Sequence, residues 1–459
     1  MTENFDAIVI GTGQAGPSLA VRLASAGRKT AIIERKLFGG TCVNVGCIPT
    51  KTLIASARAA HVARHASDYG VVIDGGIGVD MTRVKARKDA VVRQSNEGVT
   101  NWLRSTPNLT VIEGHARLEG DRNVRVNERL LEGKEIFLNV GARASVPDMP
   151  GLAEVDYLTN SGMMGVDFLP QHLVIVGGSY IGLEFAQMYR RFGSRVTVIE
   201  MGPRLIARED EDVSAAIREI LQREGVEVRL NAECITVTRQ ANGVAVGLNC
   251  EGGPPQVTGT HLLLAVGRTP NTDDLGLGQA GVTTDARGYI VVDDELRTSA
   301  PGIWALGDAN GRGAFTHTAY NDYEVVAANL LDGGQRRLTD RIPAYALFID
   351  PPLGRAGVTE REAKAAGRQA LVGSMQMSRV GRARERGETQ GFMKIIVDAQ
   401  TERILGASLL GIEGDEAIHS ILDVMYADAP YSVIRNAVHI HPTVSELIPT
   451  LLADLKPLA

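Results

Sequence analysis

Two copies of one strand, turn and helix pattern constrain the fold of this chain more than any other sequence feature. In the first copy, an apolar run from Phe5 to Ile10 leads into the glycine-rich turn Gly11-Thr-Gly-Gln-Ala-Gly16. A helical stretch, a strand from Thr30 to Ile33 and an acidic residue, Glu34, follow in that order. This order is what a dinucleotide-binding βαβ unit requires.

Each marker of the first copy has a physical reason. Gly11 permits a tight turn, Gly13 lets the backbone approach a pyrophosphate, and Gly16 lets the helix pack closely on the strand. The pyrophosphate then lies at the positive end of the helix, and Glu34 accepts hydrogen bonds from the ribose hydroxyls. We therefore expect Gly11, Gly13, Gly16 and Glu34 to bind a dinucleotide.

The second copy begins 166 residues later, counted from Gly11 to Gly177. The strand Leu173 to Val176 precedes the turn Gly177-Gly-Ser-Tyr-Ile-Gly182, and a helix to Phe192 and a strand to Ile199 follow. One chain thus carries two dinucleotide sites, and only the first is followed by a pair of cysteines, so the two sites are not equivalent.

Details of the second copy bear on the cofactor. Ser179 takes the place of the second glycine and is small enough to keep a close approach of the backbone. Glu200 accepts from a free 2′-hydroxyl and repels a 2′-phosphate, which favours NAD(H) over NADP(H). Arg204 and Arg208 lie shortly downstream, so the choice between the two cofactors stays open.

Two cysteines lie in the stretch Gly39-Gly-Thr-Cys-Val-Asn-Val-Gly-Cys-Ile-Pro-Thr-Lys51. A thiol becomes nucleophilic as the thiolate, and its pKa falls at a helix N-terminus or beside a cation. The residues from Leu53 to His65 are strong helix formers, so the positive end of a helix should face Cys47, and Lys51 adds a charge. We interpret Cys42 and Cys47 as a pair that opens and closes as a disulfide.

Two other interpretations of these residues compete with a redox pair. Cys42, Cys47, His61 and His65 have almost the spacing of a zinc finger, but a continuous helix would place His61 roughly 18 to 20 Å from Cys47, too far for one metal ion. The second alternative is a pair of inert buried thiols, against which the glycine-rich surroundings and the preceding dinucleotide unit argue. We expect no metal site here.

Composition limits the class of protein. The chain has 459 residues, enough for three domains, and a net charge of −6, which argues against nucleic acid or an anionic membrane as a partner. No apolar run approaches the roughly 18 residues that span a bilayer. The first residues lack a signal-peptide pattern, so we expect a cytoplasmic protein, where four cysteines with two closely spaced favour catalysis.

The remaining segments are less specific. A charged helix is expected from Asp80 to Ser105, and short β-like runs from Thr110 to Asn139 indicate a small antiparallel excursion. Asp308 follows a glycine at the end of a strand and by itself could be a simple turn residue. The basic run Arg379 to Arg386 is more typical of a solvated loop than of a ligand site.

From about residue 342 the pattern changes. Strand-like runs, including Met393 to Val397 and Ile404 to Leu410, alternate with helical ones and end in His-Ile-His441-Pro-Thr-Val-Ser-Glu446. A histidine with a carboxylate five residues later can act as a general acid and base if the carboxylate orients the imidazole. From the residues alone, a structural histidine is at least as probable.

Taken together, the Cys42 to Cys47 motif, the His441 to Glu446 motif and the twin fingerprints resemble the FAD-dependent pyridine nucleotide disulfide oxidoreductases. This is the family of lipoamide dehydrogenase, glutathione reductase and mercuric reductase, and the likeness spans essentially the whole chain. Within it, Val358-Thr-Glu360 and Arg382-Ala-Arg384 look closer to the reactive-chlorine-resistance flavoproteins.

The resemblance implies an α/β fold with two Rossmann-like domains and an α+β C-terminal dimerisation domain. The FAD-binding domain would comprise residues 1–145 and 270–341, the NAD(P)-binding domain residues 146–269, and the dimerisation domain residues 342–459. The protein would be a homodimer in which His441 and Glu446 serve the active site of the partner subunit.

The resemblance also implies the site. Lys51 and Glu184 would pair beside the flavin, and Tyr180 would cover its ring until the nicotinamide displaces it. The implied FAD contacts are Gly11, Gly13, Gly16, Glu34, Gly40, Thr41, Lys51, Gly141, Asp308 and Thr316. The implied NAD(P) contacts are Gly177, Ser179, Tyr180, Gly182, Glu200 and Gly267. The implied catalytic residues are Cys42, Cys47, His441, Glu446, Lys51 and Glu184.

The implied activity is an electron relay from NAD(P)H through FAD to the Cys42 and Cys47 pair and on to a small acceptor. The acceptor could be an oxidant, a metal ion or a disulfide. Lipoamide dehydrogenase, mercuric reductase and a slow redox sensor on the same scaffold are alternatives, against the last of which the intact His441 and Glu446 argue.

Three departures from the family pattern affect the choice of acceptor. His317 stands where members that act on disulfides usually have proline, and Asn139-Val-Gly141 replaces a common Ala-Thr-Gly. The chain ends in Lys-Pro-Leu-Ala459 without the cysteine pair by which mercuric reductases deliver metal. The remaining cysteines, Cys234 and Cys250, fall in the nicotinamide domain, so mercury delivery by that route is not expected.

Overall fold

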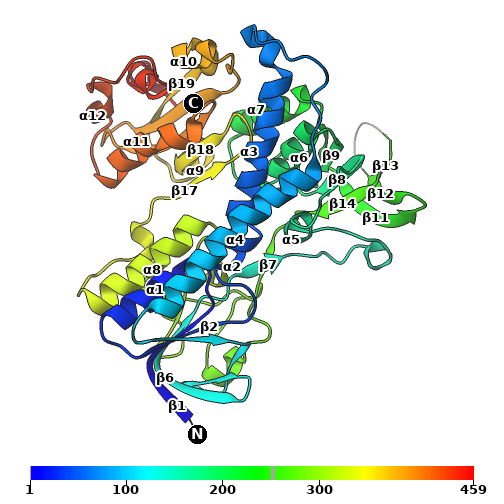
Figure 1. Cartoon of the computed structure of the whole chain (residues 1–459). Coiled ribbons are helices and arrows are strands. Elements are labelled where there is room, and N and C mark those ends of the chain that lie inside the picture. The colour runs from blue at the N-terminus through cyan, green and yellow to red at the C-terminus, as the bar shows by residue number, and fades with distance from the viewer. Residues whose placement is uncertain (1, 250–253, 459) are drawn as a thin grey trace.

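The computed structural model describes residues 2–249 and 254–458. It has three lobes, which are named here by their sheets (Figure 1). The first lobe holds a seven-stranded sheet of order β3-β2-β1-β6-β5-β4, with β16 paired to β6. Its strands are β1 (Thr2–Ile10), β2 (Thr30–Glu34), β3 (Leu109–Glu113), β4 (Ala116–Leu118), β5 (Asn123–Val126), β6 (Arg129–Leu138) and β16 (Ile303–Ala305).

Five helices belong to the first lobe and its junction with the others. They are α1 (Ala15–Ser25), α2 (Gly40–Asn44), α3 (Cys47–Arg64), α4 (Met81–Ser105) and α8 (Thr316–Leu331). Helix α1 lies beside α8 and α4 (Figure 1). The expected helix from Asp80 is confirmed, because the Asp80 side chain accepts from the Arg83 backbone N–H and caps α4.

The antiparallel excursion expected for residues 110–139 is wrong in part. Strands β4, β5 and β6 do pair antiparallel. However, β3 pairs parallel with β2, with Thr110 opposite Ala31, and β6 pairs parallel with β1. The long strand β6 therefore belongs both to the parallel sheet and to the hairpin, which a local pattern of β-like runs does not show.

The second lobe repeats the first on a smaller scale. Its parallel sheet, in the order β10-β9-β8-β14, is packed by α6 (Tyr180–Phe192) and α7 (Glu211–Arg223). The parallel strands are β8 (His172–Val176), β9 (Arg195–Ile199), β10 (Glu227–Arg229) and β14 (His261–Leu264). An antiparallel sheet adds β11 (Glu233–Gln240), β12 (Gly243–Asn249) and β13 (Gln256–Gly259). The strands and helix expected around the second glycine turn are confirmed.

Two smaller elements lie near the second lobe. The short helix α5 spans Asn160–Met163, and a two-stranded sheet pairs β7 (Ala142–Ala144) with β15 (Arg268–Pro270). The backbone of Cys234 lies in β11, whereas Cys250 lies outside the described residues.

The third lobe is an antiparallel six-stranded sheet of order β17-β18-β21-β20-β19-β22. Its strands are β17 (Ala344–Leu347), β18 (Leu353–Gly357), β19 (Ala370–Gln376), β20 (Phe392–Asp398), β21 (Ile404–Leu410) and β22 (Lys456–Pro457). Its helices are α9 (Glu360–Ala365), α10 (Gly381–Glu385), α11 (Gly414–Tyr426), α12 (Ser432–Arg435) and α13 (Ile448–Leu452). Together the three lobes confirm the expected fold class.

The basic run Arg379 to Arg386 is not the solvated loop that the sequence indicated. Residues 381–385 form α10, and Val380 and Ala383 are fully buried in the core of the third lobe. The spacing of three residues between them places both on one helical face. Arg382 donates to the Pro442 carbonyl oxygen at 2.6 Å, so the run supports the loop that carries His441.

Buried charges fix the second lobe to the third. Lys394 is 2% exposed and reaches Asp210 and Asp212, at 3.1 and 2.8 Å. Arg191 pairs with Glu224 at 2.7 Å and with Asp350. Charges that are buried without a partner cost several kcal/mol, so these contacts specify how the two lobes meet.

No helix among the described residues is long and apolar enough to cross a membrane. Helix α3 runs unbroken from Cys47 past His61, which separates these residues by about 20 Å along its axis. They cannot bind one metal ion, and no group of three suitable side chains in the described ranges is arranged to hold one.

Candidate active site

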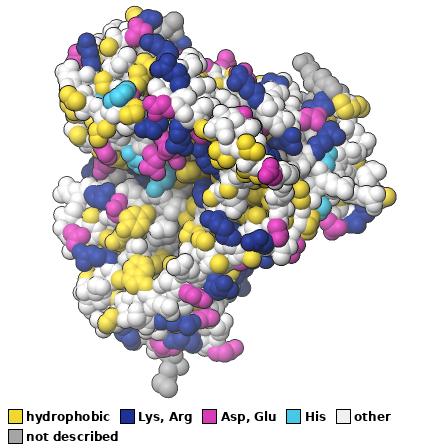
Figure 2. All heavy atoms as spheres, turned by 45° about the horizontal axis from the view of Figure 1, so that its top comes forward, with side chains coloured by type: hydrophobic (Ala, Val, Ile, Leu, Met, Phe, Trp, Pro, Cys, Tyr) yellow, Lys and Arg dark blue, Asp and Glu magenta, His cyan; other side chains and the backbone are white. Residues whose placement is uncertain are grey.

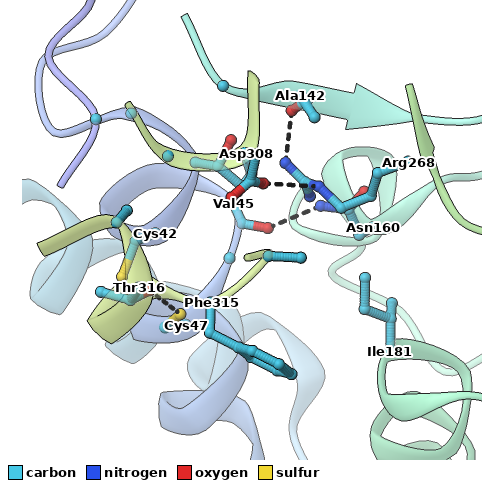
Figure 3. A pocket seen from close by; sticks show the side chains of 18 of the residues that line it. Cys42, Val45, Cys47, Ala142, Asn160, Ile181, Arg268, Asp308, Phe315 and Thr316 are labelled. Carbon is cyan, nitrogen blue, oxygen red and sulfur yellow. Dashed lines mark hydrogen bonds and ion pairs between the residues drawn. The ribbon is translucent and has the colours of Figure 1, made fainter. Parts of the chain in front are cut away.

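The two cysteines lie where two helices meet. Cys42 is in α2, and Cys47 is the first residue of α3. Gly46 joins the helices, and a Cβ atom there would lie 2.8 Å from the Thr41 carbonyl oxygen. Figure 3 shows both sulfur atoms beside Thr316, whose Oγ1 lies 3.0 Å from the Cys47 Sγ. The glycine therefore permits the tight turn that brings Cys42 back toward Cys47.

The two thiols differ in acidity. The hydrogen bond from the Cys42 thiol, the Thr316 hydroxyl and the Lys51 charge together lower the pKa of Cys47 to about 6, against the opposing effects of burial and of the Glu184 charge. The same hydrogen bond and burial raise the pKa of Cys42. When both cysteines are reduced, Cys47 is therefore the thiolate and Cys42 keeps its proton.

A charged pair lies one turn beyond Cys47. The Lys51 Nζ is 2.6 Å from the Glu184 Oε2, and it also lies over the Phe348 ring, 4.4 Å from the centroid. The other oxygen of the buried Glu184 accepts from the Phe348 backbone N–H at 3.1 Å. These contacts hold one cation at the wall of the cavity described below.

The two glycine turns make the same bonds. Glu34 accepts from the backbone N–H groups of Thr12 at 3.0 Å and Lys36 at 2.9 Å. Glu200 accepts from those of Gly178 at 2.7 Å and Gly202 at 2.8 Å. Each carboxylate thus ties the second residue of its turn to the end of the second strand.

Gly16 and Gly182 act behind these turns. A Cβ atom at Gly16 would lie 2.1 Å from the Gly11 carbonyl oxygen, and one at Gly182 would lie 2.1 Å from that of Gly177. Neither residue lines the cavity. Their part is the close packing of helix on strand that the fingerprint requires.

One cavity of about 1570 Å³ joins both turns to the cysteines. Figure 2 shows the surface hollowed between the lobes. The expected site residues that line the cavity are Gly11, Gly13, Glu34, Gly40, Thr41, Cys42, Cys47, Lys51, Gly141, Gly177, Ser179, Tyr180, Glu184, Glu200, Gly267, Asp308 and Thr316. Small-ligand pockets measure about 300–1,000 Å³, so this cavity has room for more than one ligand.

The cavity wall fits a flavin dinucleotide. At Gly141, with φ +64°, a Cβ atom would meet nothing within 4 Å, so the wall there is open backbone. Burial raises the pKa of Asp308, although Arg268 lies 3.2 Å away. Figure 3 shows Asp308 and Arg268 together on one side of the cavity. A buried carboxyl of this kind can bind hydroxyl groups of a ligand.

Several lining residues were missed by sequence reasoning. Asn139 donates to the carbonyl oxygens of Gly11 at 3.2 Å and Gly13 at 3.1 Å, and so fixes the first turn from behind. Asn160 donates to the Val45 carbonyl oxygen at 3.1 Å. Such amide contacts come from tertiary structure, and the sequence carries no local signal for them.

Aromatic rings surround Tyr180. Its ring meets those of Phe315 and Tyr345 edge-on, at centroid distances of 5.6 and 5.3 Å. The Phe315 ring stacks on those of Tyr345 and His317. The His317 Nε2 donates to the Ala344 carbonyl oxygen at 2.7 Å, so the histidine at the proline position joins α8 to β17.

His441 and Glu446 do not line the cavity of their own chain. The His441 Nδ1 donates to the Glu446 Oε2 at 2.8 Å, and the imidazole is 79% exposed while the carboxylate is 13% exposed. The carboxylate therefore orients a ring that projects from the third lobe into solvent in the single chain.

The parallel sheets, the twin turns and the cysteine pair define a flavin-type disulfide oxidoreductase. The family model for pyridine nucleotide-disulphide oxidoreductases matches residues 5–322, and the model for the dimerisation domain of the same family matches residues 343–452. The chain belongs to this family, which is FAD-dependent and uses pyridine nucleotides. The dimerisation domain supports a homodimer.

Individual relatives cover nearly the whole chain. It is 39% identical to the probable pyridine nucleotide-disulfide oxidoreductase RclA of Escherichia coli, over 98% of this chain and 99% of that protein. It is 34% identical to a dihydrolipoyl dehydrogenase of Chlorobaculum tepidum, over 98% and 96%, and 32% identical to a mercuric reductase of Streptomyces lividans, over 97% and 94%.

Solved structures agree with the sequence relatives. The structure of the HOCl-induced flavoprotein disulfide reductase RclA from Escherichia coli matches with a TM-score of 0.89 at 38% identity, covering 98% of this chain and 100% of that one. Its Cu(II) complex matches with the same TM-score, identity and coverage.

Proposed function

We propose that this protein passes electrons from NAD(P)H, through FAD, to the Cys42 and Cys47 disulfide and then to a small oxidant, metal ion or disulfide. The observation that carries the proposal is the position of Cys42 and Cys47, with the Thr316 hydroxyl 3.0 Å from the Cys47 Sγ, at the wall of a cavity that both dinucleotide turns share. When bound, FAD supplies acceptance of a hydride from the nicotinamide and transfer of two electrons to the disulfide.

The side chains of the protein determine where the charge and the proton go when the disulfide is reduced. Reduction breaks the bond between the Cys42 and Cys47 sulfurs, and it needs two electrons and one proton. Cys47 keeps the negative charge because the Cys42 thiol, Thr316 and Lys51 stabilise its thiolate. Cys42 takes the proton, which must leave before this sulfur can attack an acceptor.

The second half-reaction, in which the reduced cysteines pass electrons to the acceptor, is illustrated by a disulfide acceptor. Deprotonated Cys42 attacks one acceptor sulfur, and a mixed disulfide forms as the other acceptor sulfur leaves as a thiolate. Cys47 then attacks Cys42, which restores the intrachain disulfide and releases the second thiolate. We propose that His441 of the partner subunit, oriented by Glu446, removes the Cys42 proton and returns protons to the leaving sulfurs.

We further propose the domain and cofactor assignments. Residues 1–145 and 270–341 bind FAD, residues 146–269 bind the nicotinamide cofactor, and residues 342–459 form the dimer. Glu200 supports NADH as the preferred donor, because its carboxylate opposes a 2′-phosphate. The likeness to RclA, whose Cu(II) complex has been solved, supports a metal ion or a chlorine oxidant among the acceptors, and the cytoplasm is the proposed location.

Anaerobic reduction of the FAD-loaded protein by NADH tests the relay. We expect a long-wavelength absorption band from the Cys47 thiolate beside the flavin, and its loss in Cys47→Ser. A fully FAD-loaded protein that shows no band, or whose band survives Cys47→Ser, contradicts the proposal.

Steady-state NADH consumption tests the acceptor. The panel comprises oxidised lipoamide, glutathione disulfide, a quinone, Cu(II), Hg(II) and a hypochlorous-acid-derived oxidant, each with NADH and NADPH. Rapid turnover with any of them excludes a slow sensor. Rapid dihydrolipoamide oxidation by NAD⁺ would instead assign a lipoamide dehydrogenase.

A further inference from the structure

A second cavity, of about 720 Å³, lies beside the main one where the three lobes meet. The two cavities adjoin and share part of their lining, which includes Phe315, Tyr345, Asp308, Arg208, Arg268 and Arg355. The rim of the second cavity combines Arg208 of the second lobe with Arg312 of the first and Arg361 of the third. A ligand here would therefore contact all three lobes.

Positive charge dominates its lining. The arginines that line it are Arg208, Arg268, Arg287, Arg312, Arg341, Arg355 and Arg361, against two carboxylates, Asp308 and Glu362. Glu362 is already engaged, because it accepts from the backbone N–H and the hydroxyl of Thr359, at 2.8 and 3.0 Å. The lining thus has more cationic groups than its own carboxylates can pair.

Three of these arginines are neutralised inside the protein. Arg341 pairs with the buried Asp322, Arg355 lies 3.5 Å from the fully buried Glu209, and Arg268 lies 3.2 Å from Asp308. These three form the floor of the cavity and need no further anion.

The other four arginines, at the rim, are poorly neutralised. Arg287 and Arg312 have carboxylates only at 3.6 Å, while their own side chains are 78% and 48% exposed. Exposed pairs at such distances contribute little. The side chains of Arg208 and Arg361 form no ion pair in the described part of the chain, and the Arg361 guanidinium donates to the carbonyl oxygens of Ala207 and Arg208, at 3.3 and 3.4 Å.

The dinucleotide phosphates do not account for this cavity. Neither glycine turn, at residues 11–16 or 177–182, lines it, and neither Glu34 nor Glu200 does. Both diphosphates are expected at those turns. Arg208 lines both cavities, whereas Arg287, Arg312 and Arg361 line the second alone, so these three face a space that the two diphosphates leave free.

We propose that this second cavity binds a small, multiply charged phosphate compound, held at the rim by Arg208, Arg287, Arg312 and Arg361. Guanidinium groups match phosphate oxygens in paired hydrogen bonds. A partly enclosed cavity strengthens such contacts because water screens them less. The site goes beyond the electron relay, since no step of the relay uses it.

Inorganic pyrophosphate is the probe. We titrate it calorimetrically into the FAD-loaded dimer at constant ionic strength, with chloride as the control anion. One pyrophosphate per chain is expected to bind saturably, and about tenfold more weakly in Arg312→Gln and in Arg361→Gln, since each removes a charged hydrogen bond. Arg218→Gln is the matched control, because Arg218 is exposed on α7 and lines neither cavity.

Saturating NAD⁺ or NADP⁺ in the same titration identifies the source of the phosphate. Competition by neither assigns the site to a separate ligand, and competition by NADP⁺ alone assigns it to the extra phosphate of NADPH. Competition by both cofactors overturns the proposal, as do non-saturable binding and unchanged affinity in both rim variants.

Thermal unfolding gives a second readout. A ligand that binds only the folded protein raises the melting temperature with its concentration. We expect pyrophosphate to raise that of the wild type and of Arg218→Gln but not that of a folded Arg361→Gln protein. Equal rises in all three contradict a site at the rim.

Discussion

The Sγ atom of Cys47, the first residue of α3, lies 3.0 Å from the Oγ1 atom of Thr316, the first residue of α8. Two helices from distant parts of the chain therefore present their positive ends to one sulfur atom. Backbone N–H groups and the dipole at a helix N-terminus stabilise a nearby anion. The contact adds to the hydrogen bond from the Cys42 thiol in stabilising a thiolate on Cys47.

The first prediction concerns Thr316. Replacing it with valine removes one donor to the thiolate, and the pKa of Cys47 should rise from about 6 by roughly one unit, as expected for a lost hydrogen bond of about 1 kcal/mol. The pH dependence of iodoacetamide alkylation of the dithiol enzyme measures it. Thr316→Ser keeps the hydroxyl and should leave the midpoint unchanged, and an equal midpoint in Thr316→Val would count against the assignment.

The second prediction concerns Glu184. Glu184→Ala leaves the Phe348 N–H and Lys51 without their acceptor, and should lower the free energy of unfolding by about 2 kcal/mol, since Lys51 is partly exposed and retains some hydration. Urea denaturation at equal FAD loading measures the loss.

Two variants calibrate this result. Glu184→Gln keeps an acceptor and should lose less. Lys134→Ala breaks an exposed pair with Asp6, whose side chains are 74% and 36% exposed, and should cost at most about 0.5 kcal/mol. If Glu184→Ala lowers the free energy of unfolding no more than Lys134→Ala does, the pair of Lys51 and Glu184 does not stabilise the fold as proposed.

The third prediction uses the repeat of the glycine turns. Glu200→Ser should shift the ratio of kcat/KM for NADH over NADPH toward NADPH by about tenfold, because a charged acceptor for a ribose hydroxyl and a repulsion of a 2′-phosphate are both lost. Glu34→Ser makes the same change in the first turn and should weaken FAD retention without altering the nicotinamide preference. If Glu34→Ser instead altered the nicotinamide preference and Glu200→Ser weakened FAD retention, the assignment of FAD to the first turn and of the nicotinamide cofactor to the second would have to be reversed.

The fourth prediction concerns the dimer. Cys42→Ser and His441→Ala homodimers should both be inactive with a disulfide acceptor. After dissociation and random reassociation, about a quarter of wild-type activity should return, because half of the dimers are mixed and each mixed dimer has one intact site. Continued inactivity of a mixture that is shown to contain mixed dimers would place His441 outside the partner's site.

The twin fingerprints were predictable because their physics is local. Positive φ at Gly11 and Gly177, and the close approach behind Gly16 and Gly182, admit few residues other than glycine. The hydrogen bonds from the turn N–H groups to Glu34 and Glu200 were not predicted, because the sequence assigned these carboxylates to ribose hydroxyls. Sequence therefore predicts both turns and the start of α3 well.

Features that depend on distant partners were not predictable. The place of β3 depends on β2, 75 residues away when counted from Glu34 to Leu109. Helix α10 forms because Val380 and Ala383 find a core, although the neighbouring arginines suggest solvent. The aromatic group around Tyr180 joins residues from three separate segments, and none of them has a pattern of its own.

Helix α3 carries three functional side chains along its length. Cys47 is at its start, Lys51 lies one turn on, and Arg58 reaches Asp350 and, at 2.8 Å, Glu388 in the third lobe. Because an α-helix is stiff, a tilt of the third lobe that is transmitted through these ion pairs is expected to displace the sulfur atom as well. Subunit association and the position of the redox-active sulfur would then be coupled through one helix.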